Sequence, residues 1–159
     1  MPELPNMPAS QSIPFPFNVP FVQALGTELH EFADGVCEMR LTLIEEHMNG
    51  WEVAHGGVVM TLLDVAMAFA ARTVSADGMA VATIEMKTTF MRPAEGALRA
   101  VGRVLHHTRS IAFCEGAMYD AKGVLCASSS GTFKYLRTLG SREQPAAIDP
   151  NANPLKEMP

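Results

Sequence analysis

A carboxylate on an expected buried helix is the first feature of this sequence that could do chemistry. The segment from Gly56 to Arg72 reads GGVVMTLLDVAMAFAAR, and apart from Thr61, Asp64 and the closing arginine every side chain is apolar or absent. A helix that is hydrophobic all round is a buried helix, so Asp64 is expected in the interior. Burial of an unpaired carboxylate is costly and raises its pKa. Asp64 is therefore either paired with an arginine or capping a neighbouring turn, or it lines a cleft as a general base or nucleophile.

The face of the helix that carries this acid is small. At 100° per residue, one narrow stripe is made of Gly57, Thr61, Asp64, Ala68 and Ala71. The bulky side chains point elsewhere and suit packing on a sheet. A stripe of small side chains allows a second surface to approach closely, so we expect this face to meet another subunit.

The start of the same helix could bind an anion or a polarised oxygen. It reads His55-Gly56-Gly57. The first N–H groups of a helix have no partner within the helix, and they carry the positive end of its dipole. Two residues without side chains let a ligand oxygen come close to those N–H groups. The alternative is that the glycine pair only permits a tight turn and close packing.

The elements that must position this helix are strands. Asp34-Gly35 is a strong hairpin signal between the first two strand-like runs. One long helix after two strands, followed by an antiparallel meander of four, predicts an α+β fold with a single curved sheet. The expected elements are a helical turn at 21–25, strands at 27–31 and 36–43, a polar loop at 44–54, the helix at 56–72, and strands at 80–91, 97–106, 110–120 and 124–136.

Length and composition predict one globular domain. The chain has 159 residues, of which 48% are hydrophobic and 18% are charged, enough for one sizeable core and too few for two ordinary domains. Six prolines in the first 20 residues predict an extended arm over 1–16. We expect the folded domain over 17–137 and a loose tail over 138–159, which is rich in Pro, Asn and Ala.

Several classes of function are disfavoured by the composition. A net charge of -5 leaves no electrostatic footprint for nucleic acid. The three cysteines are far apart, and the histidines at 30, 47, 106 and 107 lack ligand spacing, so we expect neither disulfides nor a metal site. The N-terminus does not read as a signal peptide, and no run of 18 uncharged apolar residues could span a membrane. A cytoplasmic location is the default expectation.

Asn49, the run His55-Gly56-Gly57 and Asp64 together resemble the PaaI-type acyl-CoA thioesterases of the hotdog-fold superfamily. That family has an Asn or similar residue six before the His and an acid nine after it, and both spacings hold here. The resemblance covers roughly residues 17 to 136, including AVATIEM at 80–86 and FMRPA at 90–94. It implies a long helix held in a curved antiparallel sheet, in homodimers that often pair again into homotetramers.

The resemblance also implies roles for individual residues. The N–H of Gly56 would polarise the thioester carbonyl, assisted by the side-chain amide of Asn49. Asp64 of the facing subunit would attack the carbonyl or activate water, and Thr83 would help to position that water. His55 would orient the loop or contact the ligand. Because a thiol is a good leaving group, such a site needs no strong general acid, and stabilisation of the tetrahedral intermediate by N–H donors carries much of the rate.

Further candidates for substrate binding are Gly57 at the helix start and three residues at strand ends. Arg109 and Ser110 lie at a strand corner that is either a plain surface turn or a contact for the phosphates or adenosine of coenzyme A. Arg92, beside a proline, is a candidate of the same kind. Coenzyme A would enter as part of the substrate, and no separate cofactor is expected.

Three functions are therefore open. The first is hydrolysis of an acyl- or aryl-CoA thioester to the free acid and coenzyme A. The second is a hotdog-fold hydratase or dehydratase acting on an enoyl or hydroxyacyl thioester, which needs a His and a carboxylate at the substrate carbons. The third is a non-catalytic acyl-CoA-binding protein. The acyl group itself stays open.

Overall fold

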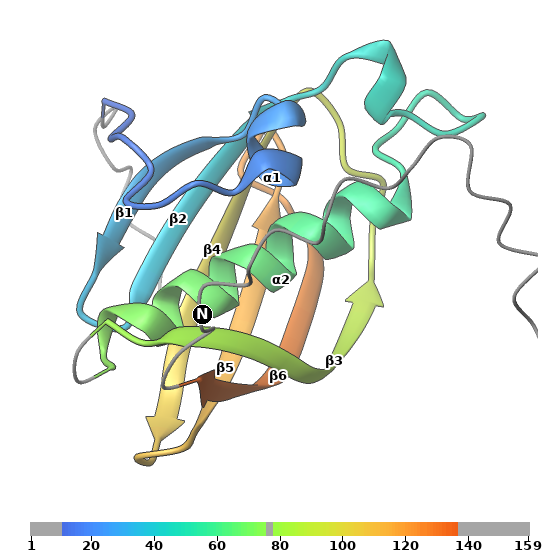
Figure 1. Ribbon diagram of the computed structural model, residues 1–159. Coiled ribbons are helices and arrows are strands. Elements are labelled where there is room, and N and C mark those ends of the chain that lie inside the picture. Colours follow the sequence, from blue (N-terminus) through green and yellow to red (C-terminus); the bar gives the residue numbers. More distant parts are fainter. Residues whose placement is uncertain (1–10, 76–77, 137–159) are drawn as a thin grey trace, which may run out of the picture.

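A six-stranded antiparallel sheet curves around one long helix in the computed structural model, which describes residues 11–75 and 78–136 (Figure 1). The strand order is β1-β2-β4-β5-β6-β3. The elements are α1 (Pro20–Ala24), β1 (Glu28–Ala33), β2 (Val36–Thr42), the 3-10 helix η1 (Glu45–His47), α2 (Gly56–Thr73), β3 (Ala80–Phe90), β4 (Ala97–His107), β5 (Ile111–Tyr119) and β6 (Leu125–Leu136). The predicted α+β fold and each of its expected elements are confirmed to within three residues at their ends.

The first hairpin forms where the sequence indicates it. Asp34 and Gly35, between β1 and β2, have φ values of 49° and 80°, the left-handed backbone that a two-residue hairpin turn of the favoured hand requires. The Gly35 N–H also donates a hydrogen bond to Oγ1 of Thr73, the last residue of α2, at 2.7 Å. The turn therefore fixes the β1–β2 pair against the C-terminal end of α2.

α2 is the centre of the core. Its bulky side chains, including Leu62, Leu63, Met67 and Phe69, are buried against the sheet. The closest approach is to β4 at Gly102, where an added Cβ would lie 2.3 Å from the backbone carbon and oxygen of Ala66. Only a glycine permits that approach. By length and composition alone α2 is long and apolar enough to cross a membrane, and in this fold it is the core helix that the sheet surrounds.

The two edges of the sheet differ. At the β1 edge, the Ile13 N–H donates to the Leu29 carbonyl at 2.7 Å, and Phe15 and Phe17 pack on Phe69 with ring centroids 6.2 Å and 4.6 Å away. The described part of the predicted N-terminal arm thus lies on the domain. The opposite edge is β3, which pairs with β6 alone among the described strands. The proposed domain boundaries remain predictions, and the predicted tail at 138–159 lies outside the described residues.

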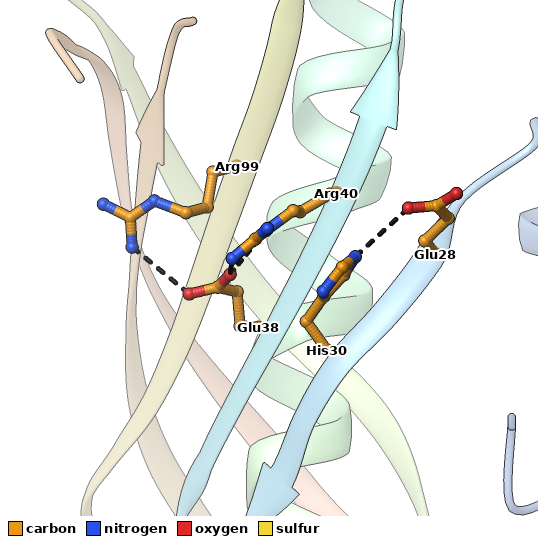
Figure 2. Close-up of polar contacts among 5 residues, drawn as sticks. All are labelled: Glu28, His30, Glu38, Arg40 and Arg99. Carbon is orange, nitrogen blue, oxygen red and sulfur yellow. Dashed lines mark hydrogen bonds and ion pairs between the residues drawn. The ribbon is translucent and has the colours of Figure 1, made fainter. Parts of the chain in front are cut away.

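The face of the sheet that points away from α2 carries a cluster of ion pairs (Figure 2). Glu38 of β2 is only 4% exposed and accepts from Arg40 Nε at 2.7 Å and from Arg99 Nη1 at 3.3 Å. The Arg99 guanidinium also lies 4.5 Å from the centre of the Tyr119 ring. These contacts join β2 to β4 and β5, and a groove of about 860 Å³ runs over the same face. Two arginines therefore share the one buried carboxylate of Glu38 on this face.

Candidate active site

Asp64 lies halfway along α2 and is held by a residue of the edge strand β3. Thr83 Oγ1 donates to Asp64 Oδ1 at 2.8 Å. Within residues 11–75 and 78–136, the ion pairs of the molecule involve other acids, and no Lys, Arg or His pairs with Asp64. The alternative that this acid is neutralised by an arginine is therefore wrong for the part of the chain that the structure describes.

The environment of Asp64 raises its affinity for a proton. Partial burial desolvates the carboxylate and raises its pKa, while the hydrogen bond from Thr83 acts in the opposite sense and lowers it. Because Thr83 occupies Oδ1, the second carboxylate oxygen is left to take a proton or to attack a carbon. A half-buried acid without a cation is the electrostatic setting of a general base or nucleophile.

The helix start is organised by His55. This residue is the N-cap of α2, with φ -60° and ψ 138°, and its Nδ1 accepts the Gly57 N–H at 2.9 Å. A Cβ at Gly57 would lie 3.1 Å from that nitrogen, so the glycine makes room for the cap. The N–H of Gly57 is consequently occupied, which corrects the expectation that both glycine N–H groups are open to a ligand. Among the described residues, the N–H of Gly56 has no acceptor.

Backbone hydrogen bonds hold the loop before α2 at two points. The His55 N–H donates to the His47 carbonyl at 2.8 Å, and the Ala54 N–H donates to the Ala94 carbonyl at 3.0 Å. His47 is buried, and its Nδ1 accepts the Ile44 N–H at 3.3 Å. These bonds fix the direction in which the Gly56 N–H points. This role of His47 is not predictable from the sequence, since it depends on the three-dimensional course of the loop.

Asn49 sits at the outer end of this loop. Its Oδ1 accepts the Trp51 N–H at 2.9 Å and its backbone carbonyl accepts the Glu52 N–H at 3.0 Å. The amide oxygen is thus used in a turn, and only the NH₂ group is left to donate to a ligand. Among the described contacts, none joins the Asn49 side chain to Gly56.

The stripe of small residues is open at the N-terminal part of α2 and closed at the other end. Gly57 is exposed, Thr61, Asp64 and Ala68 are partly exposed, and Ala71 is buried in a cluster with Phe133 and Tyr135 of the same chain. The prediction that the stripe faces outward is therefore wrong for Ala71. From Gly56 to Asp64 the helix rises eight residues, roughly 12 Å, so the two groups of one chain cannot touch the same carbonyl.

The strand-end candidates lie at two different ends of α2 within one chain. Arg92 Nη1 donates to the Leu125 carbonyl at 3.0 Å. Ser110 is part of the β4–β5 turn, and its carbonyl accepts the Tyr135 N–H at 3.0 Å. Tyr135 in turn bonds the carbonyl of Ala71, which places Ser110 and the neighbouring Arg109 near the C-terminal end of α2, opposite to Gly56.

No group of three or more His, Cys, Asp or Glu side chains suited to a metal is found in the described part of the chain. The histidines have other surroundings. His30 lies 3.1 Å from Glu28 on the outer face of the sheet, and His106 stacks on Phe113. Asp64, Thr83 and the Gly56 N–H are the candidate reactive groups that the structure describes.

Sequence comparison finds a matching family and two named relatives. A profile of the thioesterase superfamily matches residues 52–127. Two proteins of Saccharolobus solfataricus are each named "Putative esterase". One is 35% identical over 95 residues, covering 59% of this chain and 67% of that protein, and the other is 28% identical over 123 residues, covering 76% and 80%.

Solved structures agree with this assignment. A conserved protein from Pseudomonas aeruginosa has a TM-score of 0.70 at 31% identity, covering 75% of this chain and 95% of that one. The E. coli PaaI protein from the phenylacetic acid degradation operon has a TM-score of 0.70 at 21% identity, covering 75% and 86%, which shows a likeness of fold. The expected hotdog fold is confirmed, and the chain belongs to the thioesterase superfamily.

Proposed function

We propose that this protein is an acyl-CoA thioesterase, which hydrolyses an acyl- or aryl-CoA thioester to the free acid and coenzyme A. The observation that carries the proposal is the pairing of two groups on one helix. The N–H of Gly56 is directed by the His55 cap and has no protein acceptor, and Asp64 is a half-buried acid that Thr83 orients without neutralising it. Acyl transfer needs both a donor for the developing oxyanion and a base or nucleophile.

The chemistry follows from these two groups. The carbonyl oxygen of the thioester accepts from Gly56, with the Asn49 NH₂ group as second donor. Either Asp64 takes a proton from water while the water oxygen bonds to the carbonyl carbon, or the carboxylate itself bonds to that carbon. In both routes the C–S bond then breaks, and the thiolate of coenzyme A leaves and takes up a proton. The first route gives the free acid directly, and the second gives an anhydride on Asp64 that water then cleaves to the free acid. Because that thiolate is weakly basic, no general acid is required.

The active site is shared between two chains in this proposal. A reacting carbon must lie about 3 Å from both the oxyanion donor and the attacking group, and Gly56 and Asp64 of one chain are separated by roughly 12 Å along α2. Two helices packed antiparallel through their open, small-residue faces bring Gly56 of one copy beside Asp64 of the other. The unpaired edge of β3 gives the same two copies a strand to pair. We therefore propose a homodimer, which can associate further into a homotetramer.

The nucleotide part of the substrate and the cellular location complete the proposal. Arg92, Arg109 and Ser110 are the candidates for contacts with the phosphates or adenosine of coenzyme A bound by the dimer. The three cysteines are free and buried, which suits a reducing cytoplasm. Neither nucleic acid nor a membrane is needed as a partner.

A hydratase or dehydratase is less well supported by the geometry. That chemistry uses a histidine as an acid or base at the substrate carbons. Here Nδ1 of His55 is committed to the Gly57 N–H, so the imidazole acts as a helix cap. The third alternative, binding without turnover, does not explain why a half-buried carboxylate lies at Asp64.

The test is release of free thiol from a panel of acyl-CoA thioesters, measured with a chromogenic disulfide reagent. The wild type should release coenzyme A, and Asp64→Asn should lower kcat by about 100- to 10,000-fold with its fold intact. Glu115→Gln, which removes an exposed acid on the outer face of the sheet, is the matched control. Addition of water to enoyl-CoA without thiol release would contradict the proposal, as would near-normal turnover by Asp64→Asn.

A further inference from the structure

Three large apolar side chains near the start of α2 and the end of β3 are exposed in the single chain. Phe90, at the end of β3, has its ring atoms Cε1 and Cζ 3.6 Å from the point where a Gly56 Cβ would lie, yet the residue is 53% exposed. Met60, one helical turn after Gly56 on the same side of α2, is 40% exposed. Met91 follows Phe90 and is 43% exposed. An exposed cluster of this size beside a reactive donor marks a binding surface.

Two polar side chains of this region each have a hydrogen-bond partner within the chain. The imidazole of His55 caps α2 through Nδ1, and the Arg92 guanidinium donates to the carbonyl of Leu125. What a ligand would meet beside the Gly56 N–H is therefore an aromatic face and flexible thioether chains. Apolar side chains of this kind give no hydrogen-bond partner to a charged or strongly hydrated acyl group, and the methionines adapt to irregular apolar shapes.

We infer that Phe90 is a specificity-determining residue that selects apolar acyl groups and rejects short or charged ones. The inference rests on the proposed thioesterase function. When the thioester oxygen accepts from Gly56, the first carbons of the acyl group lie within contact distance of the Phe90 ring, and Met60 extends the same surface along α2. Each methylene transferred from water to this surface contributes about 0.8 kcal/mol, a factor of roughly four in kcat/KM.

The experiment measures kcat/KM by thiol release for straight-chain acyl-CoA thioesters from acetyl to decanoyl, and for succinyl-CoA. The wild type should gain about 3- to 5-fold per added methylene between butanoyl and octanoyl. Succinyl-CoA, whose acyl group ends in a carboxylate, should react at least about 100-fold less efficiently than pentanoyl-CoA, because that charge would be desolvated.

Substitutions at Phe90 assign the preference to this side chain. Phe90→Ala should lower kcat/KM for octanoyl-CoA by about 10- to 50-fold, mainly through KM, and change acetyl-CoA by less than about 3-fold, because acetyl hardly reaches the ring. Phe90→Leu, which keeps an apolar surface, should retain most of the preference. Leu105→Ala, which removes a 59% exposed side chain from the opposite face of the sheet, is the matched control and should not change the profile.

Three outcomes would overturn the inference while leaving the proposed function intact. The wild type could hydrolyse all chain lengths equally or favour charged acyl groups. Phe90→Ala could lower kcat/KM for every substrate by the same factor, which would make Phe90 a general positioning residue. The mass of Phe90→Ala in light scattering could fall to that of a smaller assembly, which would show that a neighbouring subunit covers the ring. Absence of thiol release from every acyl-CoA would instead remove the proposed function itself.

Discussion

The contact between α2 and β4 at Gly102 gives the sharpest prediction about stability. A Cβ at this position would lie 2.3 Å from two backbone atoms of Ala66 and 2.5 Å from the backbone nitrogen of Met67. Ordinary contacts start near 3.4 Å, so Gly102→Ala must separate helix and sheet by about 1 Å. Neither side can yield by rotating a side chain, because both are backbone. Overpacking of this kind costs about 3 kcal/mol, which lowers Tm by about 6 to 12 °C in a domain of this size.

Two other glycines supply a graded comparison for this prediction. A Cβ at Gly116 would meet only flexible side-chain atoms, Cδ2 of Leu63 at 3.1 Å and Cγ of Met67 at 3.3 Å, so Gly116→Ala should cost about 1 kcal/mol. Gly50 has nothing within 4 Å, and Gly50→Ala should change stability by less than about 0.5 kcal/mol. Thermal and urea unfolding of the three variants measures the order of their stability losses. A Gly102→Ala variant as stable as Gly50→Ala would refute the packing described for α2.

Three further perturbations follow from individual contacts. Thr83→Val removes the hydrogen bond that lowers the pKa of Asp64. The acidic limb of the plot of kcat/KM against pH should therefore move to higher pH. An unchanged limb would show that Asp64 is not the group whose titration sets it. Glu38→Gln removes the buried carboxylate that pairs with Arg40 and Arg99 and should cost about 1 to 3 kcal/mol in urea unfolding with kcat/KM retained. Burial raises the pKa of Cys114 to about 12, so alkylation should be slow in the native protein and fast after unfolding.

Local patterns predicted the elements of the fold well, because each of them is set by residues close in sequence. The apolar run from Gly56, the Asp34-Gly35 turn and the alternation in the strands all reappear in the structure. The acid of the site was also predictable from sequence, since a lone carboxylate in an apolar helix is costly unless it has a role.

What the sequence could not predict depends on contacts between distant segments. The contact between the exposed Phe90 ring and Gly56 joins two residues that are 34 positions apart in the sequence. The carbonyl of His47 accepts the His55 N–H only because the intervening loop folds back. Phe15 of the predicted arm and Phe17 at the start of the predicted domain both pack on Phe69 of α2. Composition and periodicity carry no information about such pairs.

The central claim is that one active site uses Gly56 of one chain and Asp64 of another. Gly56→Pro deletes the N–H donor at the first helical position, where proline is tolerated, and the extended backbone of His55 suits a following proline. Gly56→Pro and Asp64→Asn should each be inactive as homodimers. Random exchange makes half of the dimers mixed, and each mixed dimer has one intact site of two, so thiol release should recover to about a quarter of the wild-type rate.

This mixing experiment is the most direct test. The two variants are unfolded and refolded together, or exchanged at low concentration, and thiol release is compared with that of each variant treated alone. Recovery to about a quarter of the wild-type rate is the predicted result. Mixed dimers that form, as shown by differently tagged chains, and yet release no more thiol than the separate variants would contradict the shared site.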